Sequence, residues 1–276
     1  MLRKLSDEEK AELYRRSYDE SLRCGKLFDD VKTYCMFIGY PRSGHSLIGS
    51  LLDAHPDMII GHELDAMTYI EAGFSKLQIY YLLLENARAF SSSGSMRTGY
   101  TYAVPNQWQG KFWTIRIIGD KKGGGSNRRL LDNPELLPLM QKTIDDDMKF
   151  IHVIRNPYDN ISTMSLRKAR LDLKTAIEKY FGLCETVAHV KKQVRREDIF
   201  ELRHEAFLDN PRFWLSKLCH FLGAETSEDY VEACASIVNK SPHKSRHEAF
   251  WNDELLDIIK KRMEQFSFLE GYSYVE

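Results

Sequence analysis

Short apolar runs alternate with longer segments of helical periodicity along the chain. Five such runs predict buried β-strands, over residues 34–38, 58–61, 113–118, 149–154 and 199–203. The segments with helical periodicity predict helices over residues 66–90, 134–144, 171–196 and 211–222. Strands that alternate with helices are typical of a parallel β-sheet flanked by helices on both faces, whose ligands bind beyond the carboxyl ends of the strands. The pattern therefore predicts an α/β fold.

Length and composition favour one domain. A chain of 276 residues with 43% hydrophobic content can bury one sizeable core, and no segment rich in Pro, Gly and Ser divides it. We expect a single domain over residues 1–276, with a helical N-terminal extension over residues 1–30. The extension begins with the capping-box sequence Ser6-Asp7-Glu8-Glu9, which is typical of a helix start.

The charge balance and the cysteine content limit the classes of partner and the cellular compartment that we expect. Lys and Arg (39) nearly balance Asp and Glu (40), so no global field attracts nucleic acid. The five cysteines lack the spacing of metal or redox sites, which indicates free thiols in a reducing compartment. No apolar stretch reaches the roughly eighteen residues of a membrane span, and the N-terminus does not read as a signal peptide. We expect a soluble cytoplasmic protein without membrane or nucleic-acid partners.

The turn after the first predicted strand carries the most chemical information. Backbone N–H groups at a helix start lack intrahelical partners and lie at the positive end of the helix dipole, so this turn can bind an anion. The residues that can wrap such a group are Arg42, Ser43, Gly44, His45 and Ser46. The stretch is almost a Walker A loop, but His45 replaces the Lys that reaches the terminal phosphates of ATP. This difference favours a metal-free phosphate donor, with Arg42 as the permanent cation. A Pro-containing turn without a ligand remains the alternative.

A second anion site is predicted at the end of the strand over residues 149–154. Arg155 follows that strand directly, and Pro157 suits the first turn of the helix that comes next. Thr163 lies eight residues after Arg155, about two helical turns on, so both side chains can face one ligand. They form either a clamp for a second phosphate or part of a structural salt bridge.

Together these two segments resemble the 5′-phosphosulfate loop and the 3′-phosphate motif of the sulfotransferases that use 3′-phosphoadenosine 5′-phosphosulfate (PAPS). Residues 41–63 are similar to the tyrosylprotein, Golgi-type and bacterial branch of the family, and residues 203–223 and 245–272 resemble its later motifs. The resemblance implies a P-loop NTPase-like sulfotransferase fold and PAPS as the cofactor, with 3′-phosphoadenosine 5′-phosphate (PAP) as the product and no metal. It also implies transfer of a sulfuryl group to a hydroxyl, less readily an amine, of a small organic acceptor.

The resemblance also suggests catalytic roles. Glu63 follows the second predicted strand, where the tyrosylprotein branch has its proposed general base, and His62 is the nearest competitor. Arg42 and Lys121 match cations that stabilise the departing phosphate oxygen, and Lys122 is the adjacent alternative to Lys121.

The same comparison assigns a second group of residues to the nucleotide. The residues expected near the 3′-phosphate and the adenine are Arg155, Thr163, Ser162, His204, Ser245, Arg246 and His247. His204 is either an adenine contact or a hydrogen-bonded structural histidine.

The sequence does not identify the acceptor molecule. Residues 66–112 form an aromatic-rich insert on the expected acceptor side, where Tyr100 and Tyr102 either cover an acceptor or belong to a solvated loop. A P-loop small-molecule kinase or NTPase and a non-catalytic nucleotide-binding protein are the competing functions. The sequence leaves open whether the chain forms a homodimer.

Overall fold

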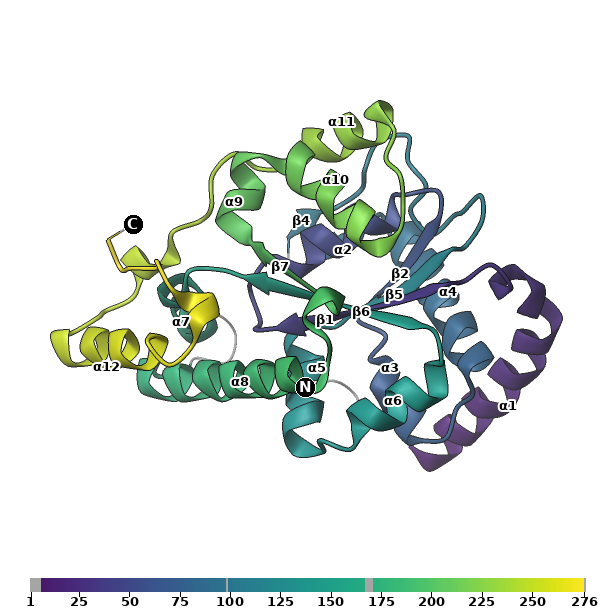
Figure 1. The fold of residues 1–276 in the computed structure, drawn as a ribbon, viewed down its shortest axis with the longest axis horizontal. Helices are drawn as coiled ribbons and strands as arrows, with labels where there is room; N and C mark the ends of the chain where they lie inside the picture. Colours follow the sequence, from purple (N-terminus) through teal and green to yellow (C-terminus); the bar gives the residue numbers. More distant parts are fainter. Residues whose placement is uncertain (1–5, 98, 167–170, 276) are drawn as a thin grey trace.

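The computed structural model describes residues 6–97, 99–166 and 171–275, and a five-stranded parallel sheet lies at its centre (Figure 1). The sheet has the order β2-β5-β1-β6-β7, and every neighbouring pair is parallel. Its strands are β1 (Thr33–Gly39), β2 (Met58–His62), β5 (Ile117–Lys121), β6 (Asp147–Ile154) and β7 (Ile199–Arg203). The predicted α/β fold with a parallel sheet is confirmed.

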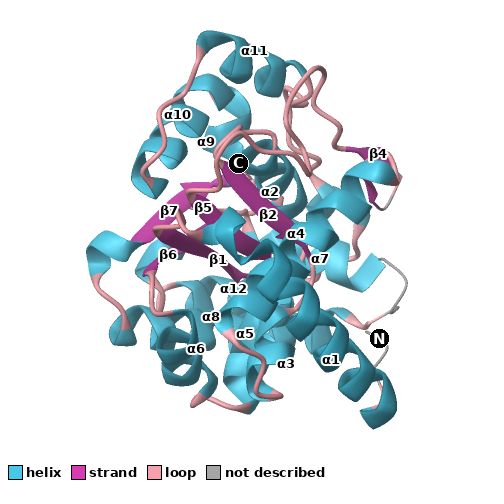
Figure 2. Ribbon diagram, turned by 90° about the vertical axis from the view of Figure 1, so that its right-hand side faces the viewer, coloured by secondary structure: helices cyan, strands magenta, loops and turns pink. Residues whose placement is uncertain are grey.

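Helices cover both faces of the sheet (Figures 1 and 2). One face packs against α2 (His45–Asp53), α9 (His204–Asp209), α10 (Pro211–Leu222) and α11 (Glu228–Ser236). The other face packs against α3 (Ala66–Glu71), α5 (Gly124–Asp132), α6 (Leu136–Ile144), α7 (Pro157–Leu166), α8 (Leu173–Gln193) and α12 (Asp253–Met263). At the β2 edge lie α4 (Lys76–Ser92) and, against it, α1 (Asp7–Cys24). None of the helices in the described ranges is both long and apolar enough to cross a bilayer.

Local capping chemistry explains where several helices begin and end. Ser6 and Glu9 form the predicted capping box of α1. Asn210 caps α10, which ends as predicted at Leu222, and Gly223 follows it in the left-handed conformation. The single helix expected over residues 66–90 is instead two helices, because Gly73 has φ +83° and Ser75 starts α4 with a capping box of its own.

The third predicted strand is displaced toward the site. The expected range was 113–118, whereas β5 spans Ile117–Lys121. The N–H groups of Trp113 and Arg116 bond to Pro56 and Asp57 in a loop, and Trp113 is largely exposed. The prediction followed the apolar residues and was wrong about the strand limits, because the last two residues of β5, Asp120 and Lys121, are charged although they are buried.

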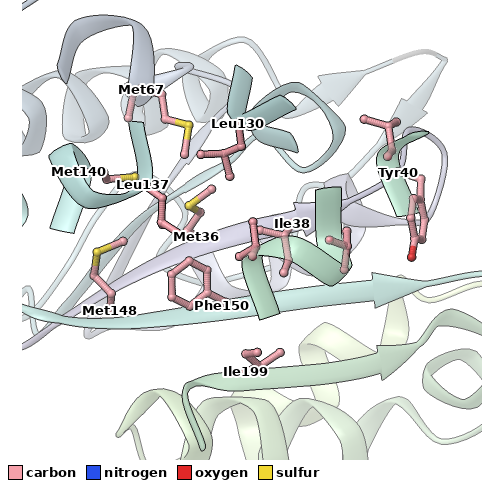
Figure 3. Close-up of a cluster of buried hydrophobic side chains, with 14 of the residues drawn as sticks. Met36, Ile38, Tyr40, Met67, Leu130, Leu137, Met140, Met148, Phe150 and Ile199 are labelled. Atoms are coloured by element: carbon pink, nitrogen blue, oxygen red, sulfur yellow. The ribbon is translucent and has the colours of Figure 1, made fainter. Parts of the chain in front are cut away.

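The core follows from the alternation along β1, all of whose residues are buried. Met36 and Ile38 point to the face covered by α3, α5 and α6, where they pack with Phe150 of β6 and with Leu137 (Figure 3). Cys35 and Phe37, between them, point to the face covered by α2 and α10. A strand buried on both faces is typical of a parallel sheet inside an α/β protein.

Gly119 provides a test of this packing. A Cβ atom on Gly119 would lie 2.2 Å from the carbonyl oxygen of Cys35 on the paired strand β1. Neither backbone can move without breaking the ladder, so Gly119→Ala should lower the free energy of unfolding by about 3 kcal/mol. Urea unfolding followed by circular dichroism measures the change.

Gly182→Ala is the matched control. Gly182 lies inside α8, and its added Cβ meets no heavy atom of the described residues within 4 Å. This variant should gain about 0.5–1 kcal/mol from helix propensity. Equal unfolding midpoints for the two variants would contradict the close strand approach.

Candidate functional site

A cavity of about 620 Å³ lies where the parallel strands end. Its walls come from the loop after β1, the ends of β2, β5 and β6, the start of α9 and the segment after α11. Parallel strands bring their carboxyl ends to one edge, so distant segments of the chain meet there. The site residues predicted from the sequence that line this cavity are Arg42, Gly44, His45, Ser46, Glu63, Lys121, Arg155, Thr163 and His204, together with Lys122.

The cavity wall is strongly cationic. Its basic side chains are Arg42, Arg97, Lys121, Lys122 and Arg155. Among the described lining residues Glu63 is the only carboxylate, although the whole chain has a formal net charge of −1. Charges of one sign that line a concave wall concentrate the field inside it, so the cavity suits a polyanion.

The loop after β1 has the shape of an anion-binding turn. Arg42 and Gly44 have positive φ angles of 71° and 94°, and no described side chain caps the start of α2. A Cβ atom on Gly44 would lie 2.5 Å from Nδ1 of His204, so the loop and α9 touch only because this residue is glycine. The uncapped N–H groups of α2 and its dipole are thus available to an anion.

Side chains from the neighbouring strand and helix fix this loop. Asn160 of α7 donates from Nδ2 to the carbonyl oxygen of Pro41 at 2.6 Å and to Oγ of Ser43 at 3.0 Å. Arg155 donates from Nη1 to the carbonyl oxygen of Arg42 at 2.9 Å. Sequence analysis missed Asn160, since its partners lie more than a hundred residues earlier in the chain.

Two side chains of this loop form hydrogen bonds with main-chain carbonyl oxygens of the protein. The hydroxyl of Ser43 donates to the carbonyl oxygen of Tyr40 at 3.1 Å, and Ser43 is not among the described lining residues. The imidazole of His45 bonds through Nε2 to the carbonyl oxygen of Ile38 at 3.2 Å, and burial lowers its pKa to about 3. His45 is therefore neutral, and the loop offers main-chain donors at these positions.

Lys121 lies at the centre of the catalytic group predicted from the sequence. Its ammonium is 3.1 Å from Oγ of Ser46 and 3.1 Å from Oε1 of Glu63. The other carboxylate oxygen of Glu63, Oε2, accepts a hydrogen bond from Arg97. The structure thus brings the loop after β1, the end of β2 and the end of β5 to one point.

These contacts set the protonation states. Burial alone would raise the pKa of Glu63, but the charges of Lys121 and Arg97 outweigh it and lower that pKa to about 2. Burial lowers the pKa of Lys121 to about 8, against the opposing effect of Glu63. At neutral pH Glu63 is ionised and Lys121 is mostly protonated.

His62 lies beside the same ammonium. Its Nε2 is 3.3 Å from Nζ of Lys121, and its ring stacks on Phe90 at a centroid distance of 3.6 Å. Burial and the charge of Lys121 lower the pKa of His62 to about 3. The imidazole is neutral and held in place by its neighbours.

The predicted 3′-phosphate residues divide into two groups. Arg155 bridges the loop after β1 to the segment before the 3₁₀ turn Ser245–Glu248, because it donates to the carbonyl oxygen of His243 as well as to that of Arg42. Thr163 lines the cavity, and its hydroxyl is 2.7 Å from that of Ser245. Arg155 and Thr163 thus line the same cavity, and Ser245 lies beside Thr163.

Ser162, Arg246 and His247 do not belong to the described cavity wall. Arg246 is 2% exposed and forms an ion pair at 3.1 Å with Asp159 of α7, which also accepts its main-chain N–H. Ser162 is fully buried, and His247 is exposed beside the ring of Tyr274. The pairing of Arg246 with Asp159 leaves no signal in the local sequence, because the two residues are far apart in the chain.

Two segments of the cavity wall carry residues that the sequence did not indicate. The hairpin of β3 (Met96–Arg97) and β4 (Tyr100–Thr101) contributes Arg97 and Tyr100, followed by Tyr102. The sequence indicated Tyr100 and Tyr102 as candidate acceptor contacts, but it gave no signal for Arg97. The segment between α11 and the 3₁₀ turn contributes Asn239, Ser241, Pro242 and His243, which sequence analysis also missed.

Comparison with known proteins gives a consistent result. The model of the sulfotransferase family matches residues 113–228. A protein-tyrosine sulfotransferase of Drosophila melanogaster is 24% identical over 192 residues, which is 67% of this chain. The chain spans only 36% of the length of that relative.

Solved structures agree on the fold. The sulfotransferase domain of the Synechococcus PCC 7002 olefin synthase is 17% identical, with a TM-score of 0.50 over 84% of this chain and 88% of that one. Sulfotransferase STF1 from Mycobacterium tuberculosis is 10% identical, with a TM-score of 0.52 over 91% of this chain and 80% of that one. The fold is that of the sulfotransferases, as the sequence resemblance implied.

The charge environment of Glu63 can be tested directly. Arg97→Gln removes one of the two nearest positive charges, so the pKa of Glu63 should rise from about 2 toward its ordinary value of 4.5. Because the folded-state pKa is depressed, Glu63 stabilises the fold fully above pH 4.5 and loses that contribution as the pH falls toward 2. Because the pKa of Glu63 is less depressed in Arg97→Gln, this carboxylate should contribute less to the free energy of unfolding above pH 4.5 in the variant.

A carboxyl ¹³C titration by NMR measures the pKa. Arg116→Gln is the control, since Arg116 is exposed and its carboxylate neighbour is Asp57. An unchanged Glu63 titration in Arg97→Gln would contradict the ion pair.

Proposed function

We propose that the chain is a sulfotransferase and that it transfers a sulfuryl group from PAPS to a hydroxyl group of a small organic acceptor. The observation that carries the proposal is the cavity itself. Among its described lining residues are five cations and one carboxylate, at the point where the start of α2 meets the ends of parallel strands. This arrangement suits an anionic donor and a proton acceptor at the same place.

The residues present fit PAPS. The loop from Arg42 to Ser46 would hold the 5′ end through main-chain N–H groups and the Arg42 guanidinium. Arg155 and Thr163 would hold the 3′-phosphate, with Ser245 beside them. His204, which touches the loop at Gly44, would lie near the adenine.

This set of side chains favours a donor that acts without a metal. PAPS supplies an activated sulfuryl group when it is bound, and PAP leaves after transfer. The one described carboxylate in the wall, Glu63, is already bound by Lys121 and Arg97, so it is a poor magnesium ligand. His45 also points back to the carbonyl oxygen of Ile38, where a P-loop lysine would reach forward to the phosphates.

Glu63 is the proposed general base. It is ionised at neutral pH and lies at the cavity wall beside the cation that would stabilise the leaving oxygen. His62 is a weaker candidate, because its pKa of about 3 makes it a poor proton acceptor at neutral pH. Of the two adjacent lysines, Lys121 is favoured over Lys122 by its contacts with Glu63 and Ser46.

A phenolic hydroxyl is the proposed acceptor group. The curated relative is a protein-tyrosine sulfotransferase, and the cavity carries two tyrosines, Tyr100 and Tyr102, on the acceptor side. Aromatic side chains at a cavity wall provide a stacking surface for a phenol ring. A volume of about 620 Å³ is in the range of small-molecule sites. The cytoplasmic location and the single domain stay predictions, and whether the chain forms a homodimer stays open.

Nucleotide selectivity tests the donor. PAP at a hundred times its dissociation constant should stabilise the protein by about 2.7 kcal/mol, whereas ATP with magnesium should have a much smaller effect. Thermal melting under both conditions measures this difference. Arg42→Gln should lose most of the PAP shift, and Arg116→Gln, a surface control, should keep it. A larger shift with ATP and magnesium would support a kinase or NTPase instead.

Turnover tests the enzyme. We expect wild-type protein to transfer label from ³⁵S-PAPS to at least one member of a pooled phenol set. Glu63→Gln should keep PAP binding within about twofold and lose about two to four orders of magnitude in kcat. Glu85→Gln, in an exposed pair with Arg88, is the matched control and should keep full kcat. Full turnover by Glu63→Gln would remove Glu63 from the base role.

A further inference from the structure

The main chain around Glu63 has an unusual conformation. Glu63 and Asp65 both have left-handed φ angles, of 63° and 70°, although neither is glycine. Such a residue carries strain of the order of 1–3 kcal/mol and persists only where its surroundings hold it. The side chains that hold this turn therefore decide where the Glu63 carboxylate lies.

The holding group is the carboxylate of Asp120. Its Oδ1 accepts the main-chain N–H of Leu64 at 3.2 Å, and its Oδ2 accepts that of Ala66 at 2.9 Å. Asp120 is 4% exposed and is not one of the described residues that line the cavity. Its two bonds bracket Asp65 within the strained turn.

A second contact fixes the far end of the same turn. Arg129 of α5 donates from Nε and Nη2 to the two carboxylate oxygens of Asp65, at 2.6 and 2.7 Å. A bidentate pair of this kind fixes both distance and orientation. Helix α3 starts directly after Asp65, so the turn is anchored to the sheet and to two helices.

The end of β5 thus acts on Glu63 from two directions. Consecutive residues of a strand point to opposite faces, so Asp120 and Lys121 lie on different sides of the sheet. Lys121 binds the carboxylate of Glu63, whereas Asp120 binds the main chain that carries it. One strand end thereby sets both the charge and the position of this side chain.

We propose that Asp120 is a positioning residue, which holds the turn at residues 63–66 so that the Glu63 carboxylate faces the acceptor hydroxyl. The inference rests on the proposed role of Glu63 as the base. A displacement of about 1 Å in a reacting group can cost about a hundredfold in rate, so a residue outside the cavity can control turnover.

Asp120→Asn tests the proposal against a matched control. Its amide keeps one carbonyl oxygen and can accept only one of the two N–H groups. We expect kcat to fall by about a hundredfold while the PAP dissociation constant changes by less than about twofold. Asp53→Asn is the control: Asp53 is also 4% exposed and also accepts two main-chain N–H groups, from Ile60 at 2.9 Å and Gly110 at 3.0 Å. It should lower the melting temperature and keep kcat.

A double-mutant cycle separates positioning from general stability. If Asp120 acts through Glu63, the Glu63→Gln/Asp120→Asn double variant should be no slower than Glu63→Gln alone. The proposal fails if Asp120→Asn keeps wild-type kcat. It also fails if the Asp120→Asn substitution lowers the kcat of Glu63→Gln by the same factor by which it lowers the kcat of the wild-type protein, or if Asp53→Asn lowers kcat as much as Asp120→Asn does.

Hydrogen exchange gives a readout that does not depend on turnover. The peptide containing Leu64 and Ala66 should exchange faster in Asp120→Asn, and the peptides containing Ile60 and Gly110 should exchange faster in Asp53→Asn. Unchanged exchange at residues 62–68 in Asp120→Asn would overturn the proposal. If wild-type protein transfers no sulfuryl group, the proposed function fails, while the exchange data still decide whether Asp120 holds the turn.

Discussion

A buried ammonium group organises this site. Lys121 is 2% exposed, and an ammonium removed from water is stable only with close polar partners. Its partners come from two segments: Ser46 lies at the start of α2, and His62 and Glu63 lie at the end of β2. Gly49 of α2 leaves the space for its stem, because a Cβ atom there would lie 2.6 Å from Cγ of Lys121. The candidate anion-binding turn and the candidate base therefore meet around one charge.

A comparable arrangement holds the other half of the cavity. Arg155 and Asn160 bind carbonyl oxygens of the loop after β1, so α7 and the end of β6 set the shape of that loop. Main-chain oxygens of the protein accept hydrogen bonds from the Arg155 guanidinium, which keeps this cation in position at the cavity wall. These hydrogen bonds fix the positive charge at the cavity wall, and a fixed charge strengthens the binding of a polyanion.

Local patterns predicted much of the fold. Strand β7 and helix α10 have the predicted limits, because a short apolar strand, a capping Asn210 and a terminal Gly223 are all local signals. The break between α3 and α4 was missed, since helical periodicity continues across Gly73. Strand β5 was displaced because its site end is charged, and only the polar partners that neighbouring segments supply allow Asp120 and Lys121 to lie buried there.

The sequence by itself determined that a Gly-containing turn and a helix start follow β1, that an arginine follows β6 and that an acid follows β2, since each depends on a few adjacent residues. Only the tertiary structure decided how each side chain is used. Arg246 pairs with Asp159, whereas Arg97 reaches Glu63 from a separate hairpin. Asp120 supports the turn that carries Glu63. These partners are far apart in the chain, and a hydrogen bond depends on the position of atoms in space, which no local pattern of residues contains.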